Sequence, residues 1–133
     1  MRLFVYDIET IINCFLFSGK FVGEPLIHTF ELSERKFEKA KLLDFLSYLQ
    51  REQITMMGYN SLGFDYPIIH EFMMNTYTFD AKKAYLLALE IIAKQNYGFT
   101  SIPFRERLIP QLDMVKINHF DNEAKRTRLK DIQ

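Results

Sequence analysis

Two carboxylates, Asp7 and Glu9, stand two residues apart directly after an apolar run near the start of the sequence. Side chains of a β-strand alternate between its faces, so both acids project from one face if this run is a strand. Acids held together at a strand end repel each other unless one keeps a proton or a cation neutralises the pair. Converging oxygen ligands of this kind suit Mg²⁺ or Mn²⁺. Asp-x-Glu alone leaves two interpretations open, a divalent metal site or solvated acids where a strand ends.

A third acid, Asp65, closes the segment Gly58-Tyr59-Asn60-Ser61-Leu62-Gly63-Phe64-Asp65, which has the composition of a strand–turn–helix junction. This junction places Asp65 in the first helical turn, where the helix dipole alone favours an acid. Asn60 is equally suited to an ordinary turn. Neither residue indicates chemistry by itself. The combination is more informative, because a strand ending in Asp-x-Glu is followed one β-β-α-β unit later by Asn-x-x-x-Phe-Asp.

This combination resembles the first two exonuclease motifs in the proofreading domains of family-B DNA polymerases, particularly those of bacteriophages. The stretch Asp7-Ile8-Glu9-Thr10 is similar to the first motif, and Asn60-Ser61-Leu62-Gly63-Phe64-Asp65-Tyr66-Pro67-Ile68-Ile69 is similar to the second. The resemblance follows the order and spacing of the whole chain, although only these two motifs are specific. It implies a ribonuclease-H-like α/β fold, with a mixed sheet and flanking helices, of the four-carboxylate exonuclease superfamily.

The resemblance implies catalytic and metal-binding roles for three residues. Asp7, Glu9 and Asp65 match the acids that hold two divalent ions, Mg²⁺ or Mn²⁺, in that family. One ion activates a water that attacks the terminal phosphodiester, and the other stabilises the departing 3′-oxygen. On this basis the three carboxylates are expected to converge.

Other residues match positions that bind the frayed 3′ end of single-stranded DNA. Thr10, Asn60 and Phe64 fall at such positions, with Phe64 contacting a base or sugar. Near the C-terminus, Leu129 and Lys130 are similar to the end of a further strand-binding segment that usually reads Ser-Leu-Lys, although here an arginine precedes them. These five residues are the expected nucleic-acid contacts.

The family's last motif is not found in this sequence. It supplies a fourth metal-binding Asp, four residues after a Tyr or five after a His, and none of the seven tyrosines or three histidines meets that spacing. Asp113 instead falls on a strand where the family usually has a structural acid. Residues 1–133 are therefore expected to form one exonuclease-type domain without its C-terminal motif, weak or inactive alone. A fragment, a split gene whose other product completes the site, and a degenerate domain remain open explanations.

Composition sets outer limits on function and location. The charges of the 17 basic and 17 acidic side chains cancel. A surface that binds nucleic acid must therefore be locally basic, or the binding must be mediated by a metal. A hydrophobic content of 48% predicts a packed core, and the single cysteine excludes an intramolecular disulfide. No apolar run is long enough to span a membrane, and the N-terminus lacks a signal-peptide pattern. We expect a cytoplasmic protein, in the host cytoplasm if a phage encodes it.

Hydrophobic patterning predicts the elements that position these side chains. Residues 2–7 are apolar on both faces, which predicts a central strand covered on both sides. Further strands are expected at 14–18, 25–32, 54–59 and 109–117, and helices at 34–52, 64–75, 81–95 and 123–133. A three-strand meander followed by strands that return through helices is an α/β pattern.

Finer details of these elements follow from individual residues. Ser33 and Asp80 have the side chains of helix N-caps, for the helices at 34–52 and 81–95. Gly19 and Gly23 flank the expected turn between the second and third strands. The residues of the 81–95 helix expected to face the core are Tyr85, Leu86, Leu89, Ile92 and Ala93.

Three functions are compatible with these patterns. The first is a metal-dependent 3′–5′ exonuclease acting on single-stranded DNA 3′ ends, as the proofreading domain of a phage DNA polymerase, with a polymerase domain or second chain completing its site. The second is a non-catalytic ribonuclease-H-like module that binds nucleic acid or a replication protein. The third is a small nuclease acting on short RNA. Divalent-metal affinity distinguishes the first two, and a comparison of DNA with RNA oligomers distinguishes the first from the third.

Overall fold

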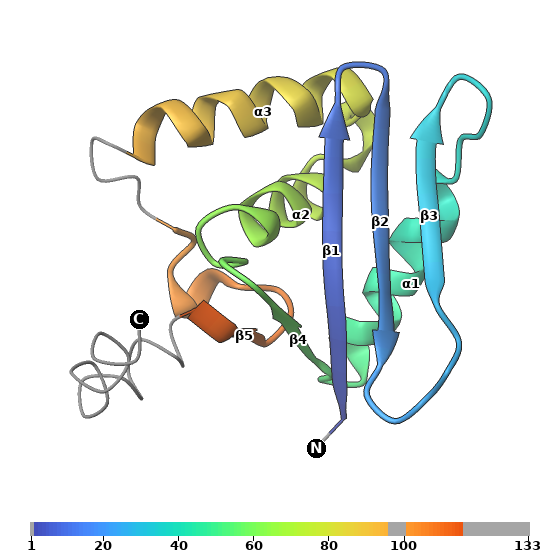
Figure 1. Cartoon of the computed structure of the whole chain (residues 1–133), viewed down its shortest axis with the longest axis vertical. Coiled ribbons are helices and arrows are strands. Elements are labelled where there is room, and N and C mark those ends of the chain that lie inside the picture. Colours follow the sequence, from blue (N-terminus) through green and yellow to red (C-terminus); the bar gives the residue numbers. More distant parts are fainter. Residues whose placement is uncertain (1, 96–100, 116–133) are drawn as a thin grey trace, which may run out of the picture.

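The computed structural model describes residues 2–95 and 101–115, which form a mixed α/β fold with a five-stranded sheet flanked by helices (Figure 1). The elements in chain order are β1 (Leu3–Ile11), β2 (Cys14–Phe21), β3 (His28–Ser33), α1 (Lys39–Arg51), β4 (Thr55–Gly58), α2 (Asp65–Met74), the 3₁₀ turn η1 (Thr76–Thr78), α3 (Ala81–Lys94), the 3₁₀ turn η3 (Phe104–Glu106) and β5 (Gln111–Asp113). The predicted order is confirmed as far as β5. The helix expected at 123–133 lies outside the described residues.

The first strand is the centre of the sheet, as its apolar composition predicts. The strand order is β3-β2-β1-β4-β5. β1 pairs antiparallel with β2, and β2 with β3, whereas β1 pairs parallel with β4, and β4 with β5. Because β4 and β5 run parallel to β1, the carboxyl ends of these three strands point the same way.

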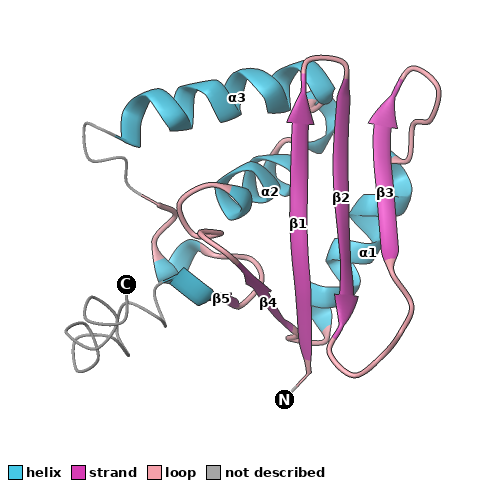
Figure 2. Ribbon diagram, viewed as in Figure 1, coloured by secondary structure: helices cyan, strands magenta, loops and turns pink. Residues whose placement is uncertain are grey.

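One face of β1 makes the core. Phe4, Tyr6 and Ile8 are buried, and Ile8 lies opposite Phe17 of β2 in the antiparallel register. Figure 2 shows α1 and α2 behind the sheet, on this side. The opposite face of β1 is more open, with Asp7 and Glu9 exposed. The expectation of a strand covered on both sides is therefore wrong for the part of the chain that the structure describes, and the acids account for the open face.

The first helix begins five residues later than the patterning predicts, at Lys39 rather than at residue 34. Ser33 does not cap it, because its hydroxyl accepts a hydrogen bond from the Lys36 N–H within a tight turn. That turn is tied to β3 by Arg35, whose guanidinium hydrogen-bonds both carboxylate oxygens of buried Glu31 at 2.8 and 3.0 Å. Local hydrogen bonds of a serine thus compete successfully with helix formation.

The connection between β2 and β3 is also corrected by the structure. Gly19 lies inside β2, where a Cβ would meet the Val5 carbonyl oxygen at 2.3 Å, so its role is close strand packing. Gly23 is the turn residue, with a φ of +90° that favours glycine. The residues after it, Leu26 and Ile27, are exposed, and β3 starts only at His28.

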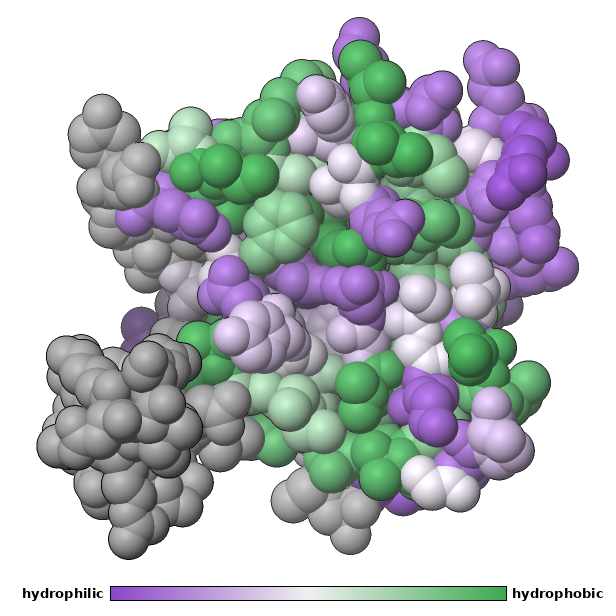
Figure 3. All heavy atoms as spheres, viewed as in Figure 1, coloured by the Kyte–Doolittle hydropathy of each residue, from purple (hydrophilic) through white to green (hydrophobic). Residues whose placement is uncertain are grey.

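Helix α3 begins where expected but faces the opposite way. The Asp80 carboxylate accepts a hydrogen bond from the Lys83 N–H at 2.8 Å, which confirms the N-cap. The buried residues are Ala84, Ala88 and Ile91, whereas the larger residues expected to face inward, Leu86, Leu89 and Ile92, are about half exposed. Alanines let the helix backbone approach β1 and β2 closely, so small size rather than hydrophobicity sets the orientation. Figure 3 shows hydrophobic side chains over α3 and hydrophilic ones in the middle of the face below.

Among the described residues, no helix combines the length and apolar character needed to cross a lipid bilayer.

Candidate active site

The candidate site lies where β1 and β4 separate. β4 pairs with β1 only from Leu3 to Val5, and β4 ends at Gly58. Beyond Val5 that edge of β1 has no partner strand in the described structure, so its backbone N–H groups need other acceptors. The chain after β4 turns back toward this gap and starts α2 at Asp65. The end of parallel pairing therefore creates the space in which an α2 side chain can meet β1.

Asp65 fills this gap. Its carboxylate oxygen Oδ2 accepts a hydrogen bond from the Ile8 N–H at 3.2 Å, and the residue is 6% exposed. Ile8 stands between Asp7 and Glu9 in the sequence, so this bond holds the Asp65 carboxylate next to the first motif. Asp7 is near enough for its charge to act on Asp65. Two acids from motifs 58 positions apart in the chain thus act on each other electrostatically.

The electrostatics of this pair are unfavourable for two charges. Burial raises the pKa of the Asp65 carboxyl to about 7, and the charge of Asp7, which favours a protonated Asp65 able to donate toward it, adds to the rise. The Ile8 N–H opposes the rise, because it stabilises the charged carboxylate. Near neutral pH the Asp65 carboxyl therefore exchanges its proton with solvent.

No basic side chain neutralises Asp7 or Asp65 within residues 2–95 and 101–115. Every lysine or arginine ion pair there is made with some other acid. Glu9 lies on the same face of β1 as Asp7, one pleat further along, and is exposed. Within the same residues no group of three or more His, Cys, Asp and Glu side chains is close enough to hold a metal ion. The structure thus places Asp7 near Asp65, but in the described residues Glu9 does not join them, so the expected convergence of three acids is not found.

Asp113 holds the turn that leads into α2. Its carboxylate accepts hydrogen bonds from the backbone N–H groups of Asn60, Leu62 and Val115, each at 2.9 Å. Asn60 has a φ of +57°, a conformation that asparagine tolerates better than most residues. The buried Asp113 is therefore a structural acid that fixes the Asn60–Asp65 segment from the end of β5.

Positions expected to contact nucleic acid are distributed unevenly around the carboxylates. Asn60 is exposed in the turn, and Phe64, directly before Asp65, is half-buried against the edge of the core. Thr10 lies opposite Phe15 in the β1–β2 register, so it belongs to the other face of β1 from Asp7 and Glu9. Leu129 and Lys130 lie outside the described residues.

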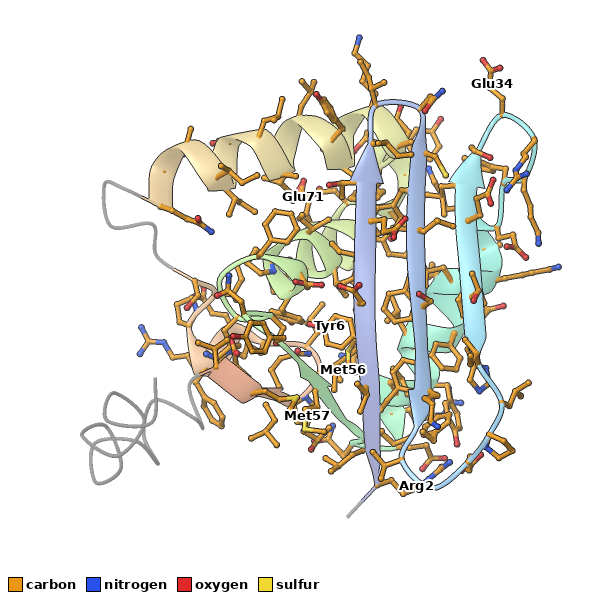
Figure 4. All side chains as sticks on the ribbon, in the orientation of Figure 1. Arg2, Tyr6, Glu34, Met56, Met57 and Glu71 are labelled. Carbon is orange, nitrogen blue, oxygen red and sulfur yellow. The ribbon has the colours of Figure 1, made fainter. Side chains whose placement is uncertain are left out.

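Two tyrosines that sequence patterns did not single out form hydrogen bonds that link the elements around the site. The Tyr6 hydroxyl donates a hydrogen bond to Gln111 Oε1 at 3.0 Å, linking β1 to β5 beneath β4. Figure 4 shows Tyr6 close to Met56 of the intervening strand. The Tyr66 hydroxyl accepts a hydrogen bond from the Leu108 N–H at 2.7 Å and so ties α2 to the segment before β5. The tyrosines occur singly in apolar runs, where core packing is the default interpretation, so the sequence gives no signal of these long-range bonds.

Replacing Asp113 with Ala should destabilise the fold by roughly 2–3 kcal/mol, because three N–H groups lose their acceptor and only the exposed ones regain water. The denaturant midpoint of unfolding measures this effect. Asp113→Asn keeps one carbonyl acceptor and should cost less, and Asp44→Ala, an exposed position on α1, is the control. Equal midpoints for the two alanine variants would contradict the structural role of Asp113.

Comparison of the chain with protein-family models, with curated proteins and with solved structures found no match. What the carboxylate site does is therefore inferred from its own geometry and from the two sequence motifs that it unites.

Proposed function

We propose that this protein is a ribonuclease-H-like, metal-dependent 3′–5′ exonuclease that acts on single-stranded DNA 3′ ends, in the manner of a phage polymerase proofreading domain. One observation supports it above others. The buried Asp65 carboxylate accepts a hydrogen bond from the Ile8 N–H and is acted on by the charge of Asp7, so acids of the two exonuclease-like motifs lie near each other. If the two motif matches were due to chance, their acids would not be expected to lie near each other where β1 and β4 separate.

The donor set fits a hard divalent cation. Carboxylate oxygens are the ligands that Mg²⁺ and Mn²⁺ prefer, and two neighbouring acids without a basic partner form a site whose charge a cation would balance. Asp7 and Asp65 would hold the ion. Glu9 is exposed on the same face, and rotation of its flexible side chain would add a third ligand. Bound there, the metal would supply activation of a water and stabilisation of the departing 3′-oxygen.

The protein's own residues would bind and orient the DNA end. Asn60 and half-buried Phe64 border Asp65, with the turn held by Asp113, so a terminal nucleotide can contact an amide and a ring that are already in place. Leu129 and Lys130 remain proposed contacts. Thr10, on the other face of β1 near its end, would reach the DNA only around the strand edge.

A fourth acid would complete the ligand set of this chemistry. The sequence has no Asp at the motif spacing from a Tyr or His, so a polymerase domain or a second chain is the proposed source. With three acids the chain should bind a second ion weakly and digest DNA slowly.

The polarity of digestion tests the proposal. Oligothymidylates labelled at the 5′ end or at the 3′ end are incubated with the protein and Mn²⁺, and products are resolved in a time course. The 3′-labelled strand should release its label as mononucleotides at the earliest times. The 5′-labelled strand should shorten stepwise. An RNA oligomer of equal length should be cut more slowly. Release from the 5′ end, or faster digestion of RNA, would overturn the assignment.

A non-catalytic module that binds nucleic acid or a replication protein is the second candidate. It is favoured by one finding, that the described acids form a pair rather than a group of three. Such a module would bind the oligothymidylate equally well with Mn²⁺ or with a chelator and would leave it intact, so the same incubation separates the two functions.

A further inference from the structure

An exposed aromatic ring stands on a short turn in the segment between α3 and β5. Phe104 of η3 is 81% exposed, and the Arg107 guanidinium lies over its ring at 5.5 Å from the centroid. Arg105 and Glu106 between them are exposed as well, which leaves the turn with a net positive charge. A large ring facing solvent is costly to hydrate, and its pairing with a cation is a chemistry that suits stacked bases and phosphates.

The turn that carries the ring is held in place by hydrogen bonds and by packing on both sides. Arg107 Nε donates a hydrogen bond to the Ile102 carbonyl at 3.1 Å, and the Arg107 N–H donates to the Phe104 carbonyl at 3.3 Å. Ile102 and Leu108, on either side of the turn, pack against the core. The backbone of the turn and the Arg107 side chain are therefore preorganised, which lowers the conformational entropy lost when a planar group stacks on the ring.

This turn is also fixed relative to the carboxylates. The Leu108 N–H donates to the Tyr66 hydroxyl at 2.7 Å, and Tyr66 is the residue after Asp65 in α2. Phe104 precedes Leu108 by four residues, a span of at most ~14 Å of extended chain. A nucleic-acid strand whose 3′ end lies at Asp65 can thus pass this turn with its upstream nucleotides.

We propose that Phe104 and Arg107 form a stacking platform for an upstream nucleotide of single-stranded DNA bound at the Asp7–Asp65 site, an inference that rests on the proposed function. The ring stacks on a base and the guanidinium meets the phosphate backbone. A single ring flanked by Arg105 and Arg107 suits a nucleic acid better than an apolar protein surface, because it offers positive charge without a contiguous apolar patch.

The test compares ligand lengths. A trinucleotide and a long oligothymidylate, both with hydrolysis-resistant phosphorothioate linkages, are titrated with Mn²⁺ present, and binding is followed by fluorescence anisotropy. Phe104→Ala should weaken binding of the long strand by about 5- to 150-fold, the loss expected for one stacked base, and leave the trinucleotide unchanged. Arg107→Gln should lower the salt dependence of binding by about one phosphate contact. Tyr77→Ala is the control, since Tyr77 is 95% exposed beyond the far end of α2 from Asp65.

A second variant gives a direct signal. The protein has no tryptophan, so Phe104→Trp introduces a single indole whose fluorescence should be quenched by the long strand, whereas that of Tyr77→Trp should not. Equal affinity of wild type and Phe104→Ala for the long strand, or an unquenched indole in Phe104→Trp, would overturn the platform alone. Wild-type protein that binds neither ligand would overturn the proposed function and the platform together.

Discussion

Replacing Asp65 with Asn should make the metal-free protein more stable at about pH 8 and remove most of the pH dependence of its stability. In the folded chain the pKa of Asp65 is raised to about 7, above the ordinary value of 3.8, chiefly by burial and then by the charge of Asp7. The folded state therefore binds this proton more tightly than the unfolded state. Stability contributed by the protonated group is complete below about pH 4 and is lost as the pH rises through about 7.

The size of this effect follows from the shift. A difference of about three pKa units corresponds to roughly 4 kcal/mol between the two ends of that window. Asparagine avoids the loss because it is neutral at every pH. Its carbonyl oxygen can accept the Ile8 N–H, and its amide can donate to the Asp7 carboxylate.

Denaturant unfolding across this pH range, with a chelator present, measures the prediction. The control is Asp44→Asn, which removes an exposed acid on α1 and should keep the wild-type pH profile. Addition of Mn²⁺ at the alkaline end should restore stability to the wild type, because the ion replaces the proton, and should do so much less in Asp65→Asn. A wild-type stability that rises between about pH 4 and pH 7 would contradict the raised pKa of a buried Asp65 beside Asp7.

Replacing Asp7 with Ala should reduce Mn²⁺-dependent release of 3′ nucleotides by more than ~100-fold, on top of a slow wild-type rate. Asp7 is the exposed member of the carboxylate pair, so its removal takes away a proposed metal ligand while the buried Asp65 keeps its hydrogen bond from the Ile8 N–H. Stability should change little or increase, because the repulsion on Asp65 is relieved.

The measurement is a single-turnover time course on a 3′-labelled oligothymidylate. Asp44→Ala, far from the site on α1, is the matched control and should digest at the wild-type rate. A chain joined to a segment that provides Tyr-x-x-x-Asp should act faster than the 133-residue chain. Digestion by Asp7→Ala at the wild-type rate would show that the activity comes from elsewhere.

Patterns with a local physical cause were predictable from the sequence. The alternation in β1 put Asp7 and Glu9 on one face, and the capping chemistry of Asp80 set the first residue of α3. The junction after β4 set the start of α2 to within one residue, at Asp65. In each case neighbouring residues in the chain decide the outcome, so periodicity and propensity suffice.

Features that depend on distant segments were not predictable in this way. Which side of α3 is buried depends on how closely β1 and β2 approach it, and the alanines that allow the approach lie between larger apolar residues that look like a better core face. The late start of α1 depends on Arg35 pairing with Glu31 of β3. The bond from the Ile8 N–H to Asp65 forms because the pairing of β1 with β4 stops at Val5. Hydrophobicity alone does not define the length of that pairing.

The binding of a divalent cation between Asp7 and Asp65 can be tested most directly by NMR with paramagnetic Mn²⁺, added in small amounts to isotope-labelled protein. The ion broadens signals of nearby nuclei, so the amide resonances of Asp7, Ile8 and Asp65 should disappear first, with Glu9 close behind. Resonances of α1 around Asp44 should persist, and Asp65→Asn should need far more Mn²⁺ for the same loss. Broadening that is absent, or that centres on other acids such as Glu71 and Glu90, would contradict a metal site at the fork of β1 and β4.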